Sequence, residues 1–188
     1  MDTTQQFEQV IDICRNIFQC KLKDYGLSWR IMRPQSITDQ IFIKANRIRS
    51  LEIKGISKVN EGIMPEFVAI VNYGVIGLIQ LEFGASTDAC DMNVEKAVAL
   101  YDKHISRTKE LMFAKNHDYG EAWRSMRISS YTDLILMKIY RTKQIEDNNG
   151  QTISSEGIDA NYMDIINYAL FGLIKLELNE NYEQAKTH

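Results

Sequence analysis

The sequence contains little cysteine, histidine, proline or glycine. Three cysteines and three histidines among 188 residues are too few and too scattered for a disulfide framework or a zinc site. Only two prolines and ten glycines occur, so long stretches contain no helix breaker. Lysine and arginine total 22 against 25 aspartates and glutamates, for a net charge of −3. This balance argues against binding to duplex DNA or to a membrane surface.

Targeting and membrane-spanning signals are also missing. The N-terminal residues MDTTQQFEQ do not show the basic segment and apolar run of a signal peptide. The longest apolar stretch, at 67–81, is too short to span a bilayer and contains Asn72, so it is predicted to be a buried core helix. We therefore expect a cytoplasmic protein.

The chain contains an internal repeat. Residues 24–51 align with 118–145 without a gap at an offset of 94, and 13 of the 28 positions are identical. A second block, FVAIVNYGVIGLIQLE at 67–82, matches YMDIINYALFGLIKLE at 162–177 at an offset of 95. Similarity at a fixed period indicates a tandem duplication.

Each repeat is predicted to form three helices. Apolar residues recur at helical spacing before Gly26 and Gly120, and glycine suits the residue that follows a helix. Thr38 and Thr132 are candidate N-caps of the second helices. The third helix is apolar nearly all round, so one repeat alone cannot cover it. The predicted fold is therefore all-α, a helical bundle in which two three-helix repeats pack around a pseudo-twofold axis.

The repeats are expected to form one compact globule. The first repeat covers 1–83, a linker covers 84–93, and the second repeat covers 94–188. Loops are predicted between the second and third helices, at 54–64 and 146–160.

Two cations of the second helix fall on or beside its predicted buried stripe in both repeats. Lys44 and Arg47 of the first repeat correspond to Lys138 and Arg141 of the second. A buried ammonium group is costly unless it meets an anion. One interpretation is that the stems pack while the charged heads reach water. The other is that these four cations bind phosphate, in which case Lys138→Met would lose nucleotide binding but keep or raise stability.

Repeated asparagines and tryptophans are candidate nucleotide contacts. Asn72 and Asn167 lie inside the apolar third helices, where each amide needs a partner. That partner is either a group across the pseudo-twofold axis or the base or sugar of a ligand. Trp29 and Trp123 are the only tryptophans. They serve either as core side chains or as stacking platforms.

Asp24 and Asp118 occupy the last turn of the first helix, where the helix dipole disfavours negative charge. One interpretation is structural: a hydrogen bond to the neighbouring tryptophan indole, or a salt bridge to a nearby arginine. The other is a metal or substrate role.

The repeats differ in their other carboxylates, because Asp164 aligns with Ala69. The second repeat is therefore predicted to carry the more complete acidic site. In that hypothesis Asp118 and Asp164 hold Mg²⁺, which prefers oxygen ligands, and Asp133 orients Lys138 or a water molecule.

The motifs K-x-x-D-Y-G-x-x-W, D-x-x-x-x-K-x-x-R and N-Y occur in both repeats. They resemble a bacterial protein family whose single-copy phage relatives are called nucleotide modification associated domains. That family is in turn similar to the all-α nucleoside triphosphate pyrophosphatases of the MazG type, which use Mg²⁺ held by E-x-x-E and E-x-x-D motifs. The resemblance implies a nucleotide ligand. This chain departs from the pattern, since its second helices lack E-x-x-E and the E-x-x-D is split between Glu66 and Asp164.

Two hypotheses follow. The first is a protein that binds a nucleotide or another phosphorylated small molecule, with Mg²⁺-dependent pyrophosphohydrolysis by Asp133 and Lys138 as its candidate activity. The alternative is a non-enzymatic helical module that associates with itself, as a homo-oligomer, or with another protein.

Overall fold

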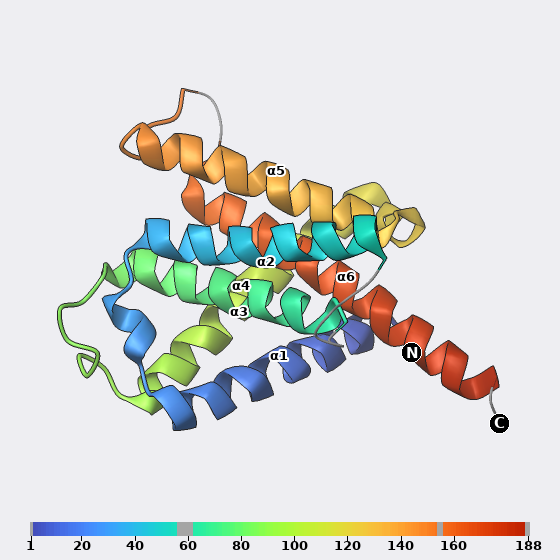
Figure 1. The fold of residues 1–188 in the computed structure, drawn as a ribbon, viewed down its shortest axis with the longest axis horizontal. Helices are drawn as coiled ribbons and strands as arrows, with labels where there is room; N and C mark the ends of the chain where they lie inside the picture. The colour runs from blue at the N-terminus through green and yellow to red at the C-terminus, as the bar shows by residue number, and fades with distance from the viewer. Residues whose placement is uncertain (1, 56–61, 154–155, 187–188) are drawn as a thin grey trace.

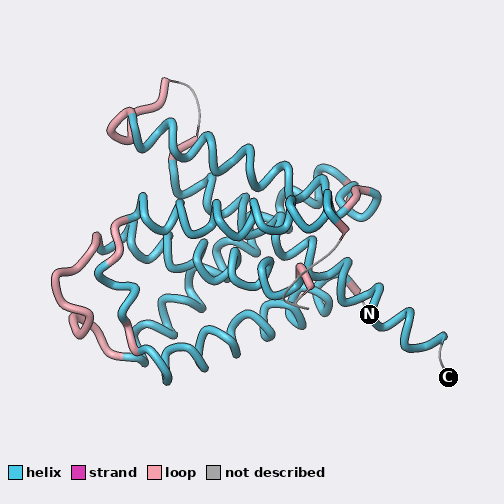
Figure 2. Tube along the Cα trace, in the orientation of Figure 1, coloured by secondary structure: helices cyan, strands magenta, loops and turns pink. Residues whose placement is uncertain are grey.

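The computed structural model describes residues 2–55, 62–153 and 156–186, with side chains described as far as residue 177. Within these residues all regular structure is helical (Figures 1 and 2), which confirms the all-α prediction. The elements of the first repeat are α1 (Thr3–Tyr25), η1 (Ser28–Ile31), α2 (Pro34–Lys54) and α3 (Met64–Phe83), where η marks a 3₁₀-helix. Those of the second are α4 (Val94–Tyr119), η2 (Ala122–Ser125), α5 (Ile128–Asp147) and α6 (Ile158–Lys186).

The first helices end where the glycines predict. Gly26 follows α1 with φ 60°, and Gly120 follows α4 with φ 58°, a backbone region that glycine adopts at low cost. The second helices begin about one turn before the predicted caps, so the N-cap assignment of Thr38 and Thr132 is wrong. Pro34 is the first residue of α2, where its fixed φ favours helix and its missing N–H costs nothing. The predicted loops include 56–61 and 154–155, which lie outside the described residues.

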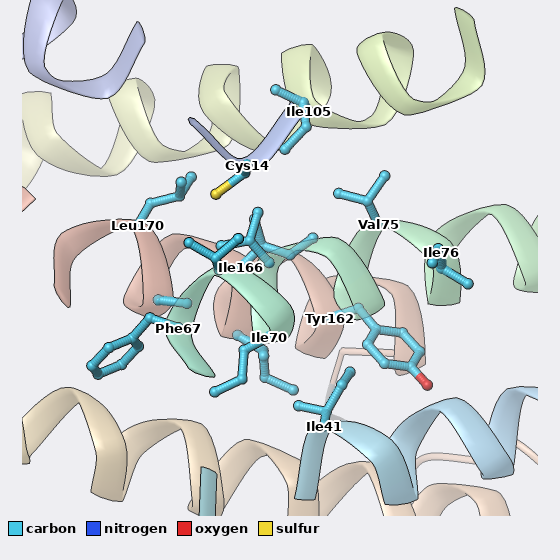
Figure 3. Packing of buried hydrophobic residues seen from close by; sticks show 14 of the residues in the cluster. Cys14, Ile41, Phe67, Ile70, Val75, Ile76, Ile105, Tyr162, Ile166 and Leu170 are labelled. Atoms are coloured by element: carbon cyan, nitrogen blue, oxygen red, sulfur yellow. The ribbon is translucent and has the colours of Figure 1, made fainter. Parts of the chain in front are cut away.

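Two helices, α3 and α6, pack against each other at the centre of the bundle. A β-carbon at Gly77 of α3 would lie 2.9 Å from the Tyr162 ring, and one at Gly172 of α6 would lie 3.0 Å from the Phe67 ring. These contacts are reciprocal, because Gly77 is equivalent to Gly172 and Phe67 to Tyr162. Figure 3 shows Phe67 and Tyr162 projecting from the central helices into the apolar core.

A second reciprocal contact joins α2 and α5, which lie side by side on one side of the central pair, while α1 and α4 cover the other (Figure 1). The Thr38 hydroxyl donates to Glu146 over 2.6 Å, and the Thr132 hydroxyl donates to Glu52 over 2.9 Å. Burial raises the pKa of both glutamates, although each of these hydrogen bonds lowers it. The swapped pairs confirm the pseudo-twofold arrangement of the repeats.

The linker between the repeats folds back on η1. Arg30 is buried and donates to the Asp91 carboxylate, with 2.7 Å between Nη2 and Oδ2, and to the Gly84 carbonyl over 2.9 Å. Its equivalent in the second repeat, Arg124, instead donates over 2.6 Å to the hydroxyl of Thr3 at the start of α1. The linker therefore belongs to the fold of the first repeat.

Among the described helices, α3 alone is long and apolar enough to cross a membrane by length and composition. Of its apolar window, 72% is buried inside the bundle. This burial agrees with the prediction of a core helix at 67–81. The prediction that this segment is too short to span a bilayer is wrong, because the helix has 20 residues.

Candidate functional site

Each repeat contains a pocket between the end of its first helix, its 3₁₀-helix and its third helix. The first pocket, in the first repeat, has a volume of about 270 Å³. The second pocket, in the second repeat, has a volume of about 330 Å³. Six equivalent positions in the two pockets carry the same residue: Lys21 and Lys115, Tyr25 and Tyr119, Trp29 and Trp123, Met32 and Met126, Asn72 and Asn167, and Tyr73 and Tyr168.

Four aromatic side chains line each pocket. Tyr25 and Tyr119 are 71% and 74% exposed, which is unusual for large rings. One of these exposed rings lies at each pocket. The indole Nε1 atoms of Trp29 and Trp123 are buried, and neither has a hydrogen-bond partner in the described part of the chain. A buried indole N–H normally finds an acceptor. The predicted bond from Asp24 or Asp118 to the indole is thus not seen.

Asn72 is hydrogen-bonded at both the nitrogen and the oxygen of its amide. Its Nδ2 donates to the Cys14 carbonyl oxygen of α1 over 3.0 Å, and its Oδ1 accepts from the Tyr101 hydroxyl of α4 over 2.7 Å. The second bond crosses from one repeat to the other, as the structural interpretation of this residue predicted. The carbonyl of Cys14 can only accept, so it fixes the amide nitrogen on its side.

Asn167 has only half of this arrangement. Its Nδ2 donates to the Thr108 carbonyl over 3.2 Å, as its equivalent does. Its Oδ1 is buried without a partner among the described residues. The difference follows from one substitution, because Phe7 occupies the position equivalent to Tyr101 and offers no hydroxyl. The second repeat therefore has a buried, unpaired acceptor where the first has a paired one.

A buried carboxylate lies in the wall of the second pocket. Asp164 is 6% exposed, and its two oxygens lie 2.6 Å from Lys115 Nζ and 2.7 Å from Lys138 Nζ. Burial lowers the pKa of Lys115, but the hydrogen bond and charge of Asp164 outweigh it, so the pKa lies above its usual value. At the equivalent position the first pocket has Ala69.

The first repeat places its carboxylate one helical turn earlier, outside the first pocket. Glu66 is 4% exposed. One oxygen lies 3.4 Å from Lys44 Nζ, and the other accepts a hydrogen bond from Arg47. Both predicted lysines and Arg47 thus meet an anion of the protein itself. Lys44 and Arg47 hold Glu66, whereas Lys138 holds Asp164.

The remaining predicted site residues lie apart from Lys138 and Asp164. Asp118 is 75% exposed, and its Oδ1 lies 3.3 Å from His117 Nδ1. Asp133 is 65% exposed and lies 3.9 Å from Arg49 across the contact of α2 with α5. The half-buried Arg141 donates to Gln144 over 3.5 Å. The structure thus joins Lys138 to Asp164, while the partners of Asp118 and Asp133 lie elsewhere.

A magnesium site is not ready-made in the described residues. No three histidine, cysteine, aspartate or glutamate side chains converge there. Both oxygens of Asp164 are occupied by lysines. These carboxylates do not fit the all-oxygen shell that Mg²⁺ requires.

A further cleft, of about 490 Å³, lies beside α4. It is lined by Glu82, Lys103, His104, Arg107 and Asp159, among others. Its charges pair with each other, with 2.8 Å from Lys103 to Glu82 and 3.3 Å from Arg107 to Asp159. We therefore assign it no ligand.

The sequence-based site missed the pocket residues on either side of the aspartate in K-x-x-D-Y-G. Lys21 and Tyr25 are four positions apart, so they share the face of α1 that lines the first pocket. Asp24, which the sequence favoured, is exposed and does not line it. The available signal was the presence of Lys115 and Tyr119 at the equivalent positions.

The fold and the site together define a tandem helical bundle with one aromatic, lysine-containing pocket in each repeat. The family described as Nucleotide modification associated domain 1 matches residues 21–81 and 115–176, and the chain belongs to this family. Each match begins at a pocket lysine, Lys21 or Lys115. Comparison with curated proteins and with solved structures gave no match.

Proposed function

We propose that the protein binds nucleotides, with the base end in the two pockets. The observation that carries this proposal is the set of six equivalent positions at which both pockets have the same residue. Folding alone does not require an exposed tyrosine, a lysine and an unbonded indole N–H at the same place in two diverged repeats. The nucleotide-related description of the family supports the same conclusion.

The pocket chemistry suits a nucleobase. Tyrosine rings offer faces for stacking, which is worth about 1–3 kcal/mol per base. The Trp123 ring already stacks on Phe171, with 4.5 Å between the ring centroids. The indole N–H offers a donor to a base or sugar. The volumes lie near the lower end of the roughly 300–1,000 Å³ range of small-molecule pockets, so we expect a single nucleoside unit in each. Lys21 is the cation of the first pocket that a phosphate would approach, and Lys115 is its equivalent in the second.

The phosphate role of Lys44, Arg47, Lys138 and Arg141 stays a proposal. In the first repeat, Lys44 and Arg47 already hold Glu66, and in the second Lys138 holds Asp164. A phosphate would compete with these carboxylates, which are buried. We therefore expect these cations to contribute less than the pocket lysines.

A thermal-shift panel tests nucleotide binding. It contains nucleobases, nucleosides, monophosphates and triphosphates of each base, with and without Mg²⁺. A ligand that binds only the folded protein raises the Tm, by about 2.7 kcal/mol of stability at 100 times its Kd. Tyr25→Ala combined with Tyr119→Ala should abolish the shift, since both rings are exposed and the fold does not depend on them. Tyr140→Ala, on an exposed ring outside the pockets, is the control. No shift with any compound would contradict the proposal.

Mg²⁺-dependent hydrolysis of a bound triphosphate is a narrower prediction. It assigns catalysis to Asp133 and Lys138 and the metal to Asp118 and Asp164. Since the described carboxylates do not form a metal site, we derive no step through a metal. Pyrophosphate release from a panel of triphosphates is the test, and the absence of release would leave binding without catalysis.

The interaction-module alternative explains the apolar third helix and the duplicated bundle without any chemistry, and the incomplete acidic motifs favour it. That helix is covered within the chain, because α6 and its neighbours bury most of α3. The apolar helix therefore gives no reason to expect a partner. Homo-oligomer formation stays a prediction that light scattering of the purified protein tests.

A further inference from the structure

We infer that the two pockets select different ligands: the first takes a phosphorylated nucleotide, and the second takes an uncharged nucleoside or base. This inference rests on the proposed nucleotide binding. It concerns two substitutions between the repeats, Ala69 for Asp164 and Tyr101 for Phe7. Each substitution changes a different property of the pockets, so they support the inference independently.

The first difference is where the carboxylate lies. In the second pocket Asp164 lies between Lys115 and Lys138 and neutralises the lysine that a phosphate would approach. In the first pocket Ala69 leaves Lys21 without an acidic partner among the described residues. A phosphate in the second pocket would meet a buried carboxylate, and such like-charge contacts select against a ligand.

The net charge of the pocket lysine, the second-helix cations and the buried carboxylate is the same in both repeats, and only the position of the buried carboxylate differs. The first repeat also has a buried carboxylate, Glu66, but Lys44 and Arg47 hold it outside the pocket. The equivalent of Glu66 in the second repeat is Asn161. Moving the acid by one helical turn therefore converts a cationic pocket into a neutralised one without changing the overall balance.

The second difference is hydrogen-bonding capacity. Trp123 and Asn167 are both at least nine-tenths buried. The indole N–H and the amide Oδ1 in the second pocket have no partner within the described chain. An uncharged ligand that reached both atoms would meet one donor and one acceptor, and nucleobase edges carry both kinds of group. In the first pocket the Tyr101 hydroxyl already occupies the amide oxygen of Asn72, so the Trp29 N–H is the donor that remains.

Site-resolved fluorescence tests the inference, because the two tryptophans of the chain lie one in each pocket. Trp123→Phe leaves Trp29 to report on the first pocket. Trp29→Phe leaves Trp123 to report on the second. Each variant is titrated with a panel of nucleosides and their 5′-monophosphates, and calorimetry of the same samples counts sites if a fluorescence change is small.

We expect the monophosphate to bind at least about tenfold more tightly than its nucleoside in the first pocket, and the order to reverse in the second. Introducing Ala69→Asp into the Trp29 reporter should shift the first pocket towards the nucleoside. Introducing Asp164→Ala into the Trp123 reporter should shift the second towards the monophosphate. The Ala69→Asp arm stands alone if the other variant does not fold, as circular dichroism would show.

The outcomes separate this inference from the proposed function. The same preference in both pockets, or a preference that Ala69→Asp does not change, would overturn the inference and leave nucleotide binding intact. The absence of binding in both reporters for every compound would overturn the proposed function itself.

Discussion

The centre of the bundle and the two pockets show opposite patterns of divergence between the repeats. At the centre the contacts are reciprocal, with Gly77 against Tyr162 and Gly172 against Phe67. In the pockets the framework is shared, but Asp164 stands where the first repeat has Ala69. A contact on a pseudo-twofold axis involves both repeats, so one cannot change without the other. A pocket belongs mainly to one repeat and can change alone.

The largest loss of stability is expected from substitutions at the symmetric contact of α3 with α6. Gly77→Val and Gly172→Val should each destabilise the protein by about 2–3 kcal/mol, because the added side chain must enter a space filled by an aromatic ring. Urea unfolding measures both. Asn46→Val, on an exposed position of α2, is the control and should cost less than about 1 kcal/mol. A large effect at one glycine alone would show that the central contacts are not equivalent.

The next largest loss of stability tests how the two buried carboxylates, Glu66 and Asp164, differ. Lys138→Met should destabilise by about 2 kcal/mol, because it removes one of two partners of the buried Asp164. Lys44→Met should cost about half as much, since Lys44 Nζ lies 3.4 Å from Glu66 whereas Lys138 Nζ lies 2.7 Å from Asp164. The sequence alone predicts that Lys138→Met keeps or raises stability, because the sequence does not show which anion this lysine meets. A Lys138→Met variant that is as stable as wild type, or more stable, would contradict the expected destabilisation.

A smaller effect concerns the amides. Phe7→Tyr should place a hydroxyl near Oδ1 of Asn167, as Tyr101 does for Asn72, and stabilise the protein by about 1 kcal/mol. Tyr101→Phe should destabilise by a similar amount, because it leaves a buried acceptor unpaired. Thermal unfolding of the two variants provides the comparison. If Phe7→Tyr destabilises, the pocket does not admit the hydroxyl in the equivalent orientation.

The smallest effect depends on pH and on one repeat only. Burial lowers the pKa of His104 below its ordinary value of 6.5, and Glu82 offsets this only in part. The unfolded state therefore binds more protons just below pH 6.5, so stability falls as the pH falls through this window. The loss should stay below about 1 kcal/mol for His104.

His104→Val, which copies Val10 of the first repeat, should reduce that slope. The free energy of unfolding is measured by urea titration between pH 7.5 and about pH 5. An unchanged slope in the variant would mean that other groups cause the acid sensitivity. One such group is Glu82, whose pKa is held low mainly by its hydrogen bond from Lys103.

The duplication and the all-α fold were predictable because the repeat and the helical periodicity are both present in the sequence. The start of α2 was not predictable in this way. Thr38 is a residue type that often caps helices, but here its hydroxyl hydrogen-bonds to Glu146 of the other repeat instead. The N-cap rule uses local sequence, and here a contact between repeats outweighs it. Pro34 was the better local signal.

The site was only partly predictable, because two different causes preserve polar residues in both repeats. Asp39 and Asp133 recur because each pairs with a cation across the α2 and α5 contact, namely Lys143 and Arg49. The pocket tyrosines and lysines recur in the twin pockets. A two-row alignment shows both classes as identical, and only the three-dimensional arrangement separates them.

The most direct test of nucleotide binding is a crystal structure of the protein with a nucleoside monophosphate at saturating concentration. We expect the base in the first pocket against Trp29 and Tyr73, with the phosphate near Lys21. A nucleotide bound outside both pockets, for instance in the cleft beside His104, would contradict this assignment, as would a structure in which neither pocket contains ligand.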